Sequence, residues 1–151
     1  MAVECRAALP HEYLLVADLR GEMAREMGSD FDAMASDWAA KFSAYFAGKH
    51  AGGNAQVFLA FEGETPVGCA IVSILEHYRR YVFGTELAYV NAVYVRSAYR
   101  RRGVASRLMQ LAIAWSRERG CKGVRLRASE DGRFLYERLG FYAGREMELD
   151  L

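Results

Sequence analysis

The sequence predicts one α/β domain built on a mixed β-sheet. The chain has 151 residues and contains no low-complexity or proline-rich stretch that would divide it. Its patterns follow the order strand, two helices, three strands, helix, strand, helix, strand. Hydrophobic residues make up 52% of the chain, which is enough for a core without disulfide or metal support. We therefore treat residues 1–151 as a single domain.

The N-terminal third predicts a strand followed by two helices. A short strand over 3–9 ends at Pro10, and a helical pattern with an apolar stripe follows from His11 to Gly28. Ser29 or Asp30 can cap a second helix, whose aromatic residues recur every three or four positions. That helix is expected to end within residues 47–53.

The central third predicts three strands. Residues 56–61 and 67–75 form a hairpin around the turn at 62–65. An aromatic and basic loop is expected over 77–83. Residues 86–95 then form a long strand that is rich in β-branched and aromatic side chains.

The C-terminal third alternates helices and strands. An amphipathic helix is expected over 103–119, where Gly120 caps its end. We then expect a strand over 123–128, a short helix over 132–139 and a closing strand over 141–149.

Several classes of protein are disfavoured by composition. The three cysteines, Cys5, Cys69 and Cys121, have neither disulfide-framework nor zinc-ligand spacing, so we expect no metal. The N-terminus lacks the features of a signal peptide, and no apolar run is long enough to span a membrane. The sequence predicts a cytoplasmic protein without a membrane partner.

Charge is unevenly distributed although the net charge is only +1. Residues 1–37 hold eight acidic side chains against three arginines, whereas residues 91–127 hold ten basic side chains against one acid. Such a chain could bind a polyanion on its C-terminal half and a cation on its N-terminal half. The simpler interpretation, which we favour for the N-terminal acids, is that they lie on solvated helix faces.

The segment 91–107 has the character of a phosphate site. A strand ends at Val95, and the next helix begins near Gly103, so the first N–H groups of that helix have no partner and favour an anion. Gly103 and Ala105 leave room for close approach, Ser106 adds a hydroxyl, and residues 100–102 are arginines. An ordinary strand-to-helix turn with a basic rim is the alternative. The nucleotide P-loop and the dinucleotide fingerprint do not match.

At these residues the sequence resembles the GCN5-related N-acetyltransferase (GNAT) superfamily. Its signature, Arg or Gln, two residues, Gly, one residue, then Gly or Ala, falls on Arg100, Gly103 and Ala105. A second block at 134–141 lies at the family's spacing. The resemblance implies about six to seven strands flanked by about four helices, with the fourth and fifth strands splayed apart. It also implies an acyltransferase that moves an acetyl group from acetyl-coenzyme A to a primary amine within a ternary complex.

The resemblance also assigns roles to individual residues. The pantetheine amides would pair with backbone groups of the fourth strand, the pyrophosphate would lie on the N–H groups of residues 101–106, and Ser129 could hydrogen-bond the pantetheine region. The expected coenzyme A contacts are Val93, Tyr94, Val95, Arg100, Arg101, Arg102, Gly103, Val104, Ala105, Ser106 and Ser129.

Tyr136 occupies the position of the family's general acid, which protonates the departing thiolate. The alternative is that Tyr136 only packs in the core. Two departures from the family pattern lie nearby: Ser129 stands where relatives carry Asn, and Gly132 where they carry Ala. The glycine leaves the turn before Tyr136 less constrained.

The sequence identifies no single general base. Glu86 on the fourth strand is a candidate, and Tyr89, Glu76 and His77 are further options. A β-bulge in that strand, which the family often has, would reverse the face of every side chain beyond it.

The acceptor is expected to lie among residues 20–50, 76–85 and 141–149. Acids there (Asp30, Asp32, Asp37, Glu76) and aromatic residues (Trp38, Tyr45, Tyr78, Tyr81) would suit a cationic amine. Two alternatives stay open: a catalytically silent acyl-coenzyme A sensor, and a nucleic-acid-binding module motivated by the arginine run and residues 78–81. The near-zero net charge disfavours nucleic acid. Family habit leaves a homodimer open.

Overall fold

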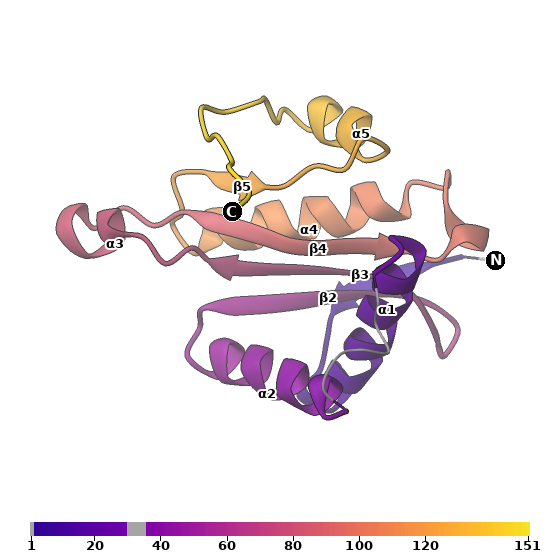
Figure 1. The fold of residues 1–151 in the computed structure, drawn as a ribbon. Coiled ribbons are helices and arrows are strands. Elements are labelled where there is room, and N and C mark those ends of the chain that lie inside the picture. The colour runs from indigo at the N-terminus through magenta and orange to yellow at the C-terminus, as the bar shows by residue number, and fades with distance from the viewer. Residues whose placement is uncertain (1, 30–35) are drawn as a thin grey trace.

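A computed structural model describes residues 2–29 and 36–151. Its single sheet has the order β1-β2-β3-β4-β5, and only the β4–β5 pair is parallel (Figure 1). The strands are β1 (Glu4–Ala7), β2 (Ala55–Glu62), β3 (Thr65–Ile74), β4 (Ala88–Val95) and β5 (Val124–Leu126). The mixed α/β architecture predicted from the sequence is confirmed.

Helices cover both faces of the sheet (Figure 1). On one face lie α1 (Tyr13–Glu26) and α2 (Trp38–Ala51), and on the other lies α4 (Val104–Glu118). The short helices α3 (Tyr78–Phe83) and α5 (Arg133–Arg138) follow β3 and β5, and two 3-10 turns, η1 (Pro10–Glu12) and η3 (Ser97–Tyr99), complete the elements.

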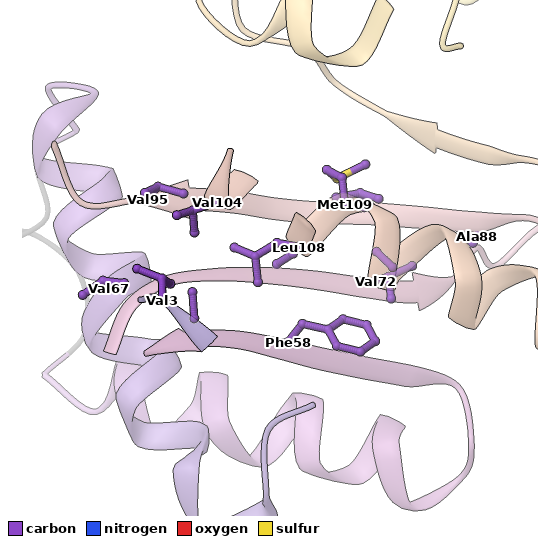
Figure 2. Close-up of a cluster of buried hydrophobic side chains, with 13 residues drawn as sticks. Val3, Phe58, Val67, Val72, Ala88, Val95, Val104, Leu108 and Met109 are labelled. Atoms are coloured by element: carbon purple, nitrogen blue, oxygen red, sulfur yellow. The ribbon is translucent and has the colours of Figure 1, made fainter. Parts of the chain in front are cut away.

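The core consists of two clusters separated by the sheet. Alternate residues of β3 divide between them: Val72 packs with α4, and Ile71 packs with α1 and α2. Leu108 and Met109 of α4 are fully buried in the cluster on the α4 side of the sheet, which also holds Val104 and Val95 (Figure 2). This packing anchors the N-terminal half of α4 to the end of β4.

A β-bulge at Asn91 divides β4 into two halves. Val90 pairs with Val72, and Ala92 pairs with Ile71, so Asn91 has no register partner in β3. Val90 packs on the α4 side and Ala92 on the α1 side, which is the reversal that a bulge produces.

The parallel pair β4–β5 opens after three residues. β5 pairs only with Ala88, Tyr89 and Val90, so residues 91–95 of β4 have no partner on that side among the described residues. The resulting β4–β5 gap is the splay that the family resemblance implies.

The C-terminal segment differs from the prediction. Residues 141–149 form no strand, and the sheet has five strands among the described residues instead of six to seven. This segment lies beside β5 through two side-chain ion pairs, Arg125–Glu146 at 3.1 Å and Arg127–Glu148 at 3.2 Å. Residues 141–149 are thus attached to β5 by side chains, not by a backbone ladder.

Residues 77–83, predicted as a loop, contain helix α3. His77 caps its start by accepting the Arg79 N–H at 3.3 Å, and Gly84 ends it in the left-handed conformation. The described chain therefore has five α-helices instead of four. The predicted start of the second helix falls within residues 30–35, outside the described residues, and α2 begins at Trp38.

An ion pair between half-exposed Arg6 and buried Glu12 fixes the junction between β1 and α1. The Glu12 carboxylate accepts from both Arg6 nitrogens at 2.7 and 2.8 Å and from the Leu9 N–H at 2.8 Å. The hydrogen bonds from Arg6 lower the pKa of Glu12 to about 2. Because the folded pKa lies below the ordinary value of 4.5, the stabilisation is present above pH 4.5 and is lost as the pH falls toward 2.

We therefore expect Glu12→Gln to lower the melting temperature most at pH 6–7, with the difference from the wild type shrinking below pH 4. Thermal unfolding followed by circular dichroism across that pH range measures this. A difference that is the same at pH 3 and pH 7 would contradict the linkage.

Candidate functional site

The turn between β4 and α4 has a backbone that favours anions. Gly103 precedes α4 with a φ of 75°, and no side chain caps that end of the helix. The first intrahelical bond runs from the Arg107 N–H to the Gly103 carbonyl, so the N–H groups of residues 104–106 have no partner within the helix. Val104 is buried while Ala105 and Ser106 are half-buried. Small side chains and free N–H groups thus coincide at the positive end of the helix dipole.

The β4–β5 gap presents unpaired backbone groups next to this turn. The Arg96 N–H donates to Val67 of β3 at 2.8 Å, so by alternation the backbone groups of Val93 and Val95 point away from β3, toward the gap. The Val95 carbonyl is already occupied, because Nε of Arg100 donates to it at 2.7 Å. The Val93 groups and the Val95 N–H remain available to a ligand.

The three consecutive arginines have different environments. Arg100 forms an ion pair with Glu26 at 2.6 Å and lies over the Tyr94 ring, with its guanidinium 5.7 Å from the ring centroid. Arg102 lies over the Tyr99 ring at 5.5 Å. Arg101 is exposed and has no hydrogen bond or ion pair with any described residue. Arg101 and Arg102 are therefore freer than Arg100 to meet a phosphate.

Tyr94 lies on the other side of the sheet. Its side chain is buried on the α1 face, where its hydroxyl donates to Glu26 at 2.8 Å, and burial together with that bond raises its pKa. Its backbone groups face β3, as the alternation requires. The structure therefore does not bring Tyr94 to the gap, although the sequence grouped it with Val93 and Val95.

Tyr136 of α5 packs at the edge of the α4-side cluster. Its ring meets Phe141 edge-on at 5.9 Å, and burial raises the pKa of its phenol. Its hydroxyl forms no hydrogen bond within the described part of the chain, which leaves it available to a ligand. Ser129 accepts the Gly132 N–H at 3.1 Å and so shapes the turn that leads into α5.

Gly132 leaves space for the Tyr136 ring. A Cβ at position 132 would lie 2.9 Å from Cε2 of Tyr136, which is closer than real contacts allow. The glycine thus fits the ring position, rather than merely loosening the turn.

We expect Gly132→Ala to displace the Tyr136 ring; if Tyr136 is the general acid that the family resemblance implies, kcat should fall roughly tenfold, since small misplacements of a reacting group are costly. The melting temperature should change little, because the ring can move away. Steady-state kinetics beside thermal unfolding measure this. An unchanged kcat would show that the ring position is not critical.

Two of the four candidate bases, Glu86 and Glu76, are bound to other side chains. Glu86 forms ion pairs with Arg80 at 3.2 Å and Arg119 at 2.9 Å, so both of its oxygens are occupied. Glu76 accepts from Arg80 at 3.2 Å and from the Tyr81 hydroxyl at 2.7 Å.

The other two candidates differ in their contacts. His77 is used as the cap of α3, where its Nδ1 accepts from the Arg79 N–H. Tyr89 is half-buried and lies on the α1 face of β4, by alternation with Val90. Its side chain alone among the four candidates forms no hydrogen bond or ion pair with a described residue.

Two acidic residues of α1, Glu22 and Glu26, were not singled out from the sequence. Glu22 holds Arg96 through two bonds at 2.7 and 3.0 Å, one helical turn before the Glu26–Arg100 pair. They line a cavity of about 440 Å³ together with Arg25, Tyr94, Arg96 and residues 97–99. The uneven charge of the sequence could have indicated these pairs, because each one joins an acid of the acidic N-terminal segment to an arginine of the basic segment 91–127.

The sequence model of the acetyltransferase (GNAT) family matches residues 17–141. The chain belongs to this family, whose members use acetyl-coenzyme A as co-substrate. None of the curated proteins matches significantly.

Solved structures share the fold over nearly the whole chain. A predicted acetyltransferase with acetyl-CoA from Clostridium acetobutylicum is 22% identical, with a TM-score of 0.84 over 99% of this chain and 96% of that one. A GCN5-related N-acetyltransferase from Ralstonia eutropha JMP134 is 28% identical, with a TM-score of 0.81 over 99% of both chains. AAC(6')-Iy in complex with the bisubstrate analog CoA-S-monomethyl-acetylneamine is 16% identical, with a TM-score of 0.80 over 100% and 98% of the two chains.

Two further properties concern the described residues. None of their helices combines the length and apolar character needed to cross a membrane. Residues 2–29 and 36–151 contain no cluster of three potential metal ligands.

Proposed function

We propose that this protein is an acetyl-coenzyme A-dependent N-acetyltransferase that acetylates a primary amine by direct attack within a ternary complex. One observation carries the proposal: the β4–β5 gap, with its unpaired Val93 backbone, opens beside the uncapped start of α4. A pantetheine arm and a pyrophosphate need these two features side by side.

The donor fits the groups available on this side of the sheet. The N–H groups of residues 104–106 would hold the pyrophosphate, and Arg101 and Arg102 would add positive charge. The pantetheine amides would pair with Val93 and with the Val95 N–H. Ser129 lies at the turn before α5, where its hydroxyl retains the capacity to donate to the same arm.

The chemistry is an acyl transfer. The amine nitrogen attacks the thioester carbonyl carbon, an N–C bond forms, and the C–S bond breaks. Tyr136 donates the proton that the departing sulfur takes, and its raised pKa keeps the phenol protonated at neutral pH. A cationic amine loses two protons: one before it attacks, which frees the nitrogen lone pair, and one as the amide forms, which balances the proton that the sulfur takes. Because Glu86 is held by Arg80 and Arg119, we assign neither proton to Glu86.

For the acceptor we propose a cationic amine that meets aromatic side chains. Tyr78 and Tyr81 of α3 are exposed, and their ring faces attract ammonium groups. Carboxylates contribute less than the sequence suggested, since Glu76 is bound to Arg80 and Asp37 lies 3.3 Å from Lys41. Asp30 and Asp32 fall outside the described residues. A homodimer stays a prediction, which sedimentation velocity would test.

A thiol-release assay with acetyl-coenzyme A across small amines, aminoglycosides and peptide N-termini tests the proposal. We expect release that depends on one amine class, with thermal stabilisation of the protein by coenzyme A. Stabilisation without release for any amine would favour a silent sensor, and absence of both would refute the proposal. Salt-dependent nucleic-acid binding without stabilisation by coenzyme A would favour the binding module.

A further inference from the structure

We propose that Glu26 of α1 is a positioning residue that holds the turn 96–103 in its coenzyme A-binding conformation by fixing Arg100. This inference rests on the proposed function, because it explains how the donor site is kept in shape. Glu26 lies outside every motif of the sequence and 74 residues before Arg100.

Arg100 is held at three points. Its Nη2 donates to Oε2 of Glu26 at 2.6 Å, its Nε donates to the Val95 carbonyl at 2.7 Å, and its guanidinium lies 5.7 Å from the centroid of the Tyr94 ring. Tyr94 in turn donates to the other oxygen of Glu26 at 2.8 Å. The Glu26 carboxylate therefore fixes both the arginine and the ring beneath it.

The residue after Arg100 requires this support. Arg101 has a φ of 64°, and it is the one non-glycine residue with a positive φ in the described chain. The left-handed region disfavours a side chain, so an arginine stays there only when neighbouring contacts hold it. Gly103, two residues later, also has a positive φ but carries no such penalty. Fixing Arg100 directly before Arg101 is what keeps the strained residue in place.

Glu22 provides an internal comparison. It lies one helical turn earlier on α1 and binds Arg96 through two bonds, at the start of the same turn. Among the described residues Arg96 makes no hydrogen bond to the Val95 carbonyl, which Arg100 occupies, and Arg96 is five residues from Arg101. Loss of the Glu22 pair therefore tests whether α1 simply needs to be attached to the turn.

Both pairs are partly exposed, at 34% for the Glu22 side chain and 45% for Glu26. Exposed ion pairs add little to overall stability, so their removal should leave the protein folded. The expected consequence is a change in the shape of the turn, which equilibrium unfolding would barely register.

The test measures the dissociation constant for acetyl-coenzyme A by calorimetry and the KM and kcat by steady-state kinetics. We expect Glu26→Gln to raise the dissociation constant and KM about fivefold to tenfold, because the strained conformation of the turn is then no longer stabilised before acetyl-coenzyme A binds. The kcat at saturating acetyl-coenzyme A should stay within twofold. Glu22→Gln should have a clearly smaller effect. Equal effects of the two variants would overturn the assignment to Glu26.

Two substitutions at position 101 allow the effect of Glu26→Gln to be compared with and without backbone strain. Arg101→Ala and Arg101→Gly both remove the guanidinium, but only glycine tolerates the left-handed backbone without penalty. Added to Arg101→Ala, Glu26→Gln should raise the dissociation constant for acetyl-coenzyme A strongly. Added to Arg101→Gly, it should raise that constant by less than twofold. The same effect in both backgrounds would overturn the inference.

These outcomes separate the two proposals. If the wild-type protein binds neither coenzyme A nor acetyl-coenzyme A, the proposed function fails. If the wild type binds and Glu26→Gln binds equally well, only the positioning role fails. Should Glu26→Gln not fold, Arg100→Gln removes the same ion pair from the other side, together with the bond to the Val95 carbonyl, and is expected to raise the dissociation constant at least as much.

Discussion

Replacing Tyr136 with Phe is expected to lower kcat about a hundredfold, the usual contribution of a positioned general acid. The substitution removes only the hydroxyl, so the edge-on contact with Phe141 and the packing of α5 should persist. The dissociation constant for acetyl-coenzyme A should therefore stay within twofold of the wild-type value. Steady-state kinetics with the acceptor found by the thiol-release screen, together with calorimetry, measure both quantities.

Tyr142 provides the matched control for this prediction. It is 89% exposed and lies six residues further along the chain, so Tyr142→Phe should leave kcat unchanged. Full turnover by Tyr136→Phe, with chemistry shown to be rate-limiting, would mean that the phenol packs α5 and donates no proton.

Replacing Leu108 with Ala is expected to cost about 3 kcal/mol of unfolding free energy, as for other large-to-small changes in a core. Leu108 has an exposed fraction of 0% and lies in the cluster between α4 and the sheet (Figure 2). Its Cδ1 would be 3.5 Å from a Cβ built at Gly68, so it packs directly against the β3 backbone there. The melting temperature should fall by about 6–12 °C.

Leu9→Ala serves as the comparison, since that side chain is 51% exposed and should cost far less. Urea unfolding followed by circular dichroism gives both free energies. If the two substitutions cost the same, then α4 is not anchored through this cluster, and the placement of its N-terminus would need another explanation.

Elements with strong local patterns were predictable from the sequence. The helix expected over 103–119 is α4 (Val104–Glu118), because its apolar spacing and flanking glycines are local signals. The hairpin of β2 and β3 was predicted for the same reason. The position of the turn between β4 and α4 was predicted as well, since it needs only a strand, a glycine and a helix in sequence.

Features that depend on contacts between distant segments were not predictable. The predicted strand over 141–149 is wrong, because the alternating pattern of a segment does not tell whether a neighbouring strand pairs with it. The Glu26–Arg100 pair joins residues far apart in the chain, so no local pattern marks it. Tyr94 was grouped with Val93 and Val95, although side chains alternate along a strand.

The bulge at Asn91 makes β4 tolerant of substitution there but intolerant of a change in length. The Asn91 side chain is exposed and bonds only Ser73 at 2.8 Å and the Tyr89 carbonyl at 3.2 Å, so other polar residues could stand in its place. Deleting or inserting one residue in β4 would instead turn Val93 and Val95 toward α1 and Tyr94 toward α4. Among homologous sequences, the spacing between Val90 and Gly103 should therefore vary far less than the residues within it.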